Sequence, residues 1–103
     1  MPDFAKIRRE TIRWQILLTL NNARPIGCYD KLVLAVIQAE YPDSTLHEIH
    51  KELVYLADRQ LLKIRRDPDG RWHVELIRYG VDIVEYTIDC EPGIARPENY
   101  TNA

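Results

Sequence analysis

The side chains best suited to bind an anionic partner gather around one short turn in this sequence. The segment IRRDPDGRWHV (residues 64–74) surrounds the turn sequence Asp67-Pro68-Asp69-Gly70 with positive charge. Four cations flank the turn: Lys63, Arg65, Arg66 and Arg71. Residues 59–78 carry six Lys and Arg against three Asp and Glu, whereas the whole chain has a net charge of −2. Such a cluster is typical of a phosphate-binding surface. The alternative is a solvated hairpin tip whose charges prevent edge-to-edge aggregation.

Two further sets of polar residues have a spacing that could contact nucleic acid from helices. The first set lies at the start of a predicted helix: Ser44, Thr45, His47, His50 and Lys51. The second set recurs at helical spacing near the N-terminus: Lys6, Arg9 and Arg13. Hydroxyl groups at a helix N-terminus, and imidazole or ammonium donors, can contact phosphates.

The same predicted helix carries side chains that do not suit DNA. We expect its solvent-facing side to include four residues that are not cationic: Glu48, Glu52, Tyr55 and Asp58. The three carboxylates among them would repel phosphates. They therefore favour a partner other than nucleic acid.

The chemistry-bearing residues give no support for a metal site or for catalysis. His47 and His50 are closer in sequence than the two His of the zincin motif HExxH. Cys28 and Cys90 have no Cys or His close enough in sequence to complete half of a zinc site. A glycine-rich phosphate loop, a nucleophile elbow and carboxylates paired at catalytic spacing are all missing from the sequence. We therefore expect no metal, no cofactor and no enzymatic activity, with Cys28 as a buried small side chain.

Length and composition are those of an ordinary single-domain protein. The chain has 103 residues, of which 46% are hydrophobic and 29% charged. No apolar stretch approaches the roughly 20 residues needed to cross a bilayer. The N-terminal sequence MPDFAKIRRE lacks the apolar core of a signal peptide. We expect one domain in the cytoplasm, without membrane contact and with both Cys residues reduced.

The first predicted helix begins at an Asp cap. Asp3 can cap a helix that runs to about Asn21. Its apolar stripe contains five residues: Phe4, Ile7, Thr11, Trp14 and Leu18. The second half of this helix is also apolar on the other side, so we expect that half to be buried all round.

Two more segments complete the helical half of the chain. The segment DKLVLAVIQAE (residues 30–40) is apolar on every face at its centre and fits either a short helix enclosed by neighbours or a buried strand. Pro42 ends this segment in either case. Thr45 and Glu48 form a capping box, which predicts a third helix through about Arg59.

A hairpin and a tail are predicted for the remainder. The stretches LLKIRR and RWHVELI alternate as half-buried strands do on either side of the Asp67–Gly70 turn. The segment YGVDIVEY (residues 79–86) fits either a short helix or a strand. From Asp89 onward the Pro and Gly residues predict an extended or partly disordered tail. The predicted organisation is a domain over residues 1–88 and a tail over 89–103.

The order of helix, helix, helix and hairpin resembles that of winged-helix proteins. The capped third helix, RQLLKIRRDPDGRWHVELIRYG (residues 59–80) and the closing GVDIVE carry this resemblance, which covers about residues 10–86. In that family the strand after the wing often runs into L-T-x-x-G. This chain has Leu76-Ile77-Arg78-Tyr79-Gly80, with Ile77 at the capping position. The segment YGVDIVEYTIDCEPGIARP (residues 79–97) also resembles small winged-helix proteins of Mu-like prophages.

The resemblance implies an α+β, mainly helical fold. Its parts are a three-helix bundle, a C-terminal two-stranded hairpin wing, a short fourth helix and an extended tail. It also implies that the third helix enters the major groove of double-stranded DNA while the wing contacts the backbone nearby, in a regulatory or accessory role. The alternative is a winged-helix protein-interaction module without DNA binding, which forms a homodimer through the first helix or the tail, or binds another protein.

Overall fold

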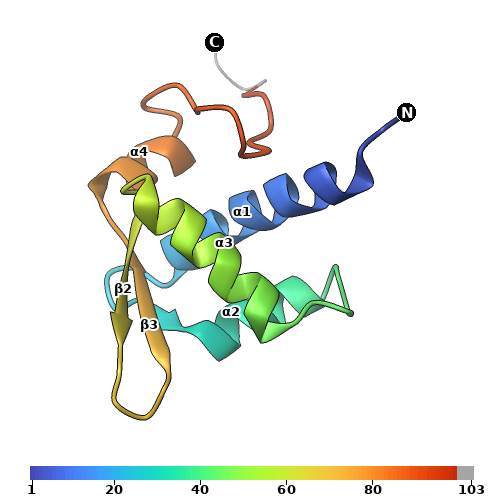
Figure 1. Ribbon diagram of the computed structural model, residues 1–103. Helices are drawn as coiled ribbons and strands as arrows, with labels where there is room; N and C mark the ends of the chain where they lie inside the picture. The colour runs from blue at the N-terminus through green and yellow to red at the C-terminus, as the bar shows by residue number, and fades with distance from the viewer. Residues whose placement is uncertain (100–103) are drawn as a thin grey trace.

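The computed structural model describes residues 1–99, which form four helices and one small antiparallel sheet. In chain order the elements are α1 (Phe4–Asn22), β1 (Cys28–Tyr29), α2 (Asp30–Gln38), α3 (Leu46–Asp58), β2 (Leu62–Arg66), β3 (Trp72–Leu76) and α4 (Arg78–Val84). The strands lie in the order β1-β3-β2. In Figure 1, α3 crosses in front of α1 and the β2–β3 hairpin projects away from the helices. The α+β, mainly helical class predicted from the sequence is confirmed.

Helix α1 begins at the predicted cap but buries a different face from the predicted one. The Asp3 carboxylate accepts a hydrogen bond of 3.1 Å from the backbone N–H of Lys6. The fully buried residues of α1 are Ile12, Ile16, Leu17 and Leu20. Phe4, Ile7 and Leu18 are 75%, 51% and 38% exposed, so the predicted apolar stripe is wrong at both ends of the helix. The exposure of Leu18 also contradicts the expectation that the second half of the helix is buried all round. The reason is that the core packs on the opposite side of α1.

The segment after β1 is a helix, α2, which settles the choice between helix and strand. Val33 and Ile37 are fully buried against the core. Leu32 and Val36 lie on the other side and are 54% and 43% exposed. The expectation that neighbours would enclose this segment is therefore wrong, because α2 packs on the molecule through only one face.

Helix α3 has half of its predicted capping box. The Thr45 hydroxyl oxygen accepts a hydrogen bond of 3.2 Å from the backbone N–H of Glu48. The Glu48 carboxylate does not complete the box. It binds the guanidinium of Arg8 instead, because α1 lies against this turn of α3.

The predicted hairpin is confirmed, and an additional strand joins it. The backbone N–H of Asp67 donates to the carbonyl oxygen of Arg71 at 2.8 Å, and Gly70 adopts a positive φ of 90° within the turn. Strand β1 pairs with β3, with Cys28 opposite Val74. A strand of two residues is too short to show alternation, so no pattern in the sequence predicted it.

The last described segments pack back onto the helices. Residues 78–84 form α4 rather than a strand, although Ile77 provides no side-chain cap. Gly80 is buried, and a Cβ atom there would overlap the carbonyl oxygen of Leu61. Residues 89–99 contain neither helix nor strand, yet Ile94 is buried and the Ala95 N–H donates to the Glu10 carbonyl oxygen at 3.1 Å. The remainder of the predicted tail, residues 100–103, lies outside the described residues.

Candidate nucleic-acid interface

Helix α3 and the hairpin form a shallow hollow with a cationic and aromatic lining. Five residues line it: His47, His50, Lys51, Val54 and Trp72. Arg66 lies at its edge, with its guanidinium carbon 4.3 Å from the centroid of the Trp72 ring. We call these six residues the α3–hairpin surface.

The imidazole of His50 is fixed in place from two sides. Its ring stacks on the Trp72 ring, with centroids 3.8 Å apart and planes 6° from parallel. Its Nε2 atom lies 2.6 Å from a carboxylate oxygen of Asp30, which is almost fully buried at the start of α2. These contacts join α2, α3 and the hairpin behind the surface. The Trp72 ring and the His50 imidazole are therefore ordered before any ligand arrives, which lowers the entropic cost of binding.

The carboxylates of α3 that the sequence led us to place in solvent are mostly turned toward α1. Both carboxylate oxygens of Glu48 accept from Arg8, at 2.9 and 3.0 Å. Glu52 is buried and forms an ion pair of 2.7 Å with Arg13. The expectation that Glu52 faces solvent is wrong, because positions 48 and 52 lie one turn apart on the side that meets α1. Asp58, at the far end of α3, remains exposed.

Tyr55 also makes contacts on the inner side of α3, where two arginines lie over its ring. The guanidinium carbons of Arg13 and Arg59 lie 3.4 and 3.6 Å from the centroid of its ring. Such cation–π contacts stabilise both partners when the cation is desolvated. The outer side of α3 is therefore left with His47, His50 and Lys51 as its polar groups over most of its length.

Three of the four hairpin cations are neutralised within the hairpin itself. Lys63 pairs with Glu75 at 2.8 Å, Arg65 with Asp67 at 2.8 Å, and Arg71 with Asp69 at 2.6 Å. Arg66 is the exception: within residues 1–99 it forms no ion pair, and its guanidinium lies over Trp72.

The electrostatics of the turn follow from these pairs. The side-chain hydrogen bond from Arg65, together with one from the Tyr29 hydroxyl, lowers the pKa of Asp67 to about 2. The backbone and side-chain N–H groups of Arg71 lower the pKa of Asp69. Both carboxylates are therefore ionised at neutral pH. They reduce the positive potential that Arg65 and Arg71 present to a partner.

The predicted N-terminal cations separate into exposed and buried groups. Lys6 is exposed, and Arg9 lines a hollow between α1 and α3 that also contains His47 and Lys51. Arg13 is 7% exposed and donates to Glu52 and, at 2.8 Å, to the carbonyl oxygen of Gly93. The expectation that Arg13 shares an exposed face with Lys6 and Arg9 is wrong, because α3 and the tail cover it.

The two hydroxyl groups just before α3 also differ in exposure. Ser44 is 4% exposed, and its hydroxyl oxygen accepts from Arg8 at 3.2 Å, so it is not available to a phosphate as predicted. Thr45 is exposed while its hydroxyl oxygen caps the helix.

Sequence reasoning did not find Trp72 or Asp30 as members of this site. Trp72 lies directly opposite Arg66 in the β2–β3 register, so the predicted hairpin contained a signal for that pair. The contact between Asp30 and His50 joins residues 20 positions apart, and no local pattern reports it.

Three negative findings accompany this site. Within residues 1–99, His, Cys, Asp and Glu do not gather into a group that could hold a metal ion. Over the same residues no helix is long and apolar enough to span a bilayer. Comparison of the chain with family models, with curated proteins and with solved structures finds no match.

Proposed function

We propose that this protein is a winged-helix module that binds double-stranded DNA through the α3–hairpin surface. The order of elements supports the proposal: α1, a short strand, α2, α3 and a hairpin whose strands complete one sheet. In winged-helix proteins that bind DNA, the equivalents of α3 and the hairpin face the duplex together. A regulatory or accessory role belongs to the same proposal, as does a prophage origin, which the resemblance of residues 79–97 to prophage proteins suggests.

One observation carries the assignment of the binding face. The α3–hairpin surface contains two unpaired cations, two imidazoles and an indole, and it contains no carboxylate, since Glu48 and Glu52 are bound to arginines of α1. A surface with this composition attracts phosphates and offers ring and donor groups to bases.

The chemistry favours backbone contacts over reading of base sequence. Lys51 and Arg66 are placed to neutralise phosphates, and His47 is exposed near the start of α3, where base edges would lie. Helix α3 contains no Arg, Asn or Gln, which make most bidentate contacts to bases. We therefore expect weakly specific binding with a dissociation constant of about 10⁻⁶ to 10⁻⁴ M at physiological salt.

A titration of a labelled random duplex, followed by fluorescence anisotropy at several salt concentrations, tests the proposal. Lys51, Arg66 and Arg9 would neutralise about three phosphates, so the plot of log affinity against log salt should have a slope of about −3. Absence of binding at low salt would reject DNA as the partner.

A second candidate function is protein interaction without DNA. It is favoured by the exposed apolar side of α2, which carries Leu32 and Val36. The two functions are distinguished by the same titration, because a pure interaction module has no salt-dependent affinity for a duplex.

A further inference from the structure

The hollow in the α3–hairpin surface is lined mostly by carbon atoms, although cations lie beside it. Val54 and Trp72 contribute apolar groups to the lining, while Lys51 and Arg66 bring positive charge to the same surface. Phosphates bind to the cations and gain nothing from the carbon atoms. The backbone contacts proposed above therefore leave the apolar part of the hollow without a partner.

Val54 is the apolar member of the outward stripe of α3. The stripe consists of His47, His50, Lys51 and Val54, which recur at spacings of three and four residues and line the same hollow. The His50 imidazole is stacked on Trp72 and its Nε2 atom contacts Asp30, so it is not free to reach a base. Val54 is half-buried, and its methyl groups lie on the side of the helix that meets base edges when such a helix enters the major groove.

The Trp72 ring cannot serve as a stacking platform for a base, because both of its faces are covered. The His50 imidazole lies parallel to it with centroids 3.8 Å apart, and the guanidinium carbon of Arg66 lies 4.3 Å from its centroid. Two groups at these distances cannot share one face of a ring, so they lie on opposite faces. Only the edge of the indole is left to a ligand. A single-stranded nucleic acid, whose bases stack on open aromatic faces, therefore does not fit this hollow.

We infer that the hollow receives the 5-methyl group of a thymine in the major groove of double-stranded DNA, and that Val54 contacts this methyl group. The inference rests on the proposed function and names the feature of the duplex that the surface distinguishes. The thymine methyl is the apolar group among the base edges of the major groove, and apolar side chains contact it. The positive charge of Lys51 and Arg66 complements the phosphates of the same duplex. One apolar contact gives a preference for thymine and not a defined operator sequence, which agrees with weakly specific binding.

Replacement of thymine by uracil tests the inference on the unchanged protein. Uracil lacks the methyl group and keeps every hydrogen-bonding group of thymine. The full chain should bind a duplex of mixed sequence about fourfold more tightly than the same duplex with uracil in place of every thymine, which is the effect expected for burial of one methyl group. The measurement is an anisotropy titration of the two labelled duplexes at low salt.

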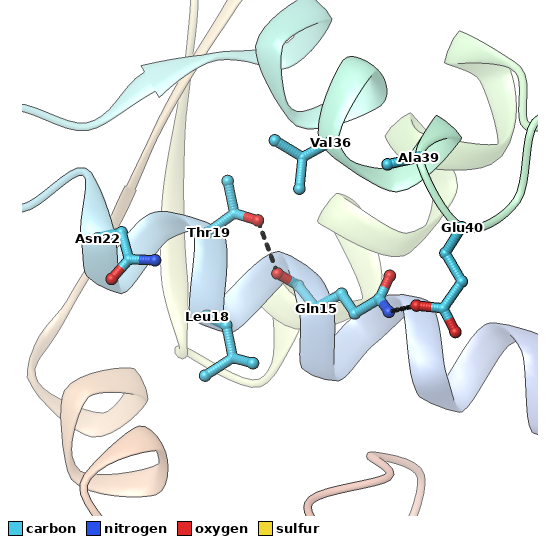
Figure 2. Close-up of a pocket in the computed structure, with 7 residues that line it drawn as sticks. All are labelled: Gln15, Leu18, Thr19, Asn22, Val36, Ala39 and Glu40. Carbon is cyan, nitrogen blue, oxygen red and sulfur yellow. Dashed lines mark hydrogen bonds between the residues drawn. The ribbon is translucent and has the colours of Figure 1, made fainter.

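A variant of Val54 shows whether this residue makes the contact. V54S removes both methyl groups of the side chain and keeps every charge, so it should bind the two duplexes equally while its salt slope stays at about −3. The matched control is V36S, the same substitution in α2. Figure 2 shows Val36 across a groove from Thr19 of α1, and V36S should keep the preference of the parent. Thermal unfolding shows whether both variants fold.

The outcomes separate this inference from the proposed function. Equal binding of the two duplexes by the parent, with a salt slope of about −3, would overturn the inference and leave the proposed function standing. A preference for thymine that V54S retains would also overturn it, because the methyl group would then act elsewhere. Tighter binding of a single-stranded oligonucleotide than of the duplex would reject it, since bases would then reach an open ring face. Absence of duplex binding at low salt would reject the proposed function and this inference together.

Discussion

Removal of two cations from the α3–hairpin surface should weaken DNA binding much more than removal of two cations from the tip of the hairpin. The perturbed residues are Lys51 and Arg66, both exposed and without an ion pair in the described part of the chain. Each loss of a phosphate contact flattens the salt slope by about 0.9, so K51A/R66A should flatten it by about 1.8. At about 1 kcal/mol for each contact, the dissociation constant should rise about thirtyfold.

The matched control is R65A/R71A, which removes the same number of positive charges from the hairpin. Arg65 and Arg71 are already paired with Asp67 and Asp69, so their loss should flatten the slope by less than about 0.9. The assay is the anisotropy titration at several salt concentrations, with thermal unfolding to show that both variants fold. Equal effects of the two double variants would refute the argument, because long-range net charge and not the α3–hairpin surface would then govern binding.

Three further predictions concern the contacts that hold this surface. T45A should lose about 1 kcal/mol of unfolding free energy in urea, since it removes the cap of α3, and an unchanged urea midpoint would contradict the capping geometry. E52A should cost about 3 kcal/mol, because it leaves the buried Arg13 without its carboxylate, and E52Q should cost less. The pKa of Asp67, held at about 2 by Arg65 and Tyr29, lies below its unfolded value of 3.8, so its contribution to stability is present above pH 3.8 and is lost as the pH falls toward 2. D67N should therefore lose less stability than the parent between pH 5 and pH 2.5, and equal losses in urea unfolding would contradict the ion pair.

Local signals in the sequence predicted those parts of the fold that depend on contacts between residues a few positions apart. Asp3 and Thr45 mark the starts of α1 and α3 because each cap bonds a backbone N–H three residues away. The Asp67–Gly70 turn determines the hairpin register for the same reason. The exposure of Phe4 and the burial of Ile94 depend on which elements pack against them, and neither follows from periodicity.

The same distinction between local and distant contacts applies to the candidate site. Helical spacing placed His47 and Lys51 on the outer side of α3, where the structure has them. The burial of Arg13 and Ser44 could not be predicted, because their partners come from other helices and from the tail. The most important contact that the sequence did not indicate is the one between Glu48 and Arg8. It spans 40 residues and removes a carboxylate from the outer side of α3.

Chemical-shift mapping tests the central claim most directly. An isotope-labelled sample of the full chain is titrated with a random duplex at low salt, and the backbone amide and Trp72 indole signals are followed. Binding through the α3–hairpin surface predicts the largest shifts at His47, His50, Lys51, Arg66 and the Trp72 indole, with small shifts at Arg65 and Arg71. Shifts confined to the outer face of α2, or no shifts at all, would contradict the assignment of this surface to DNA.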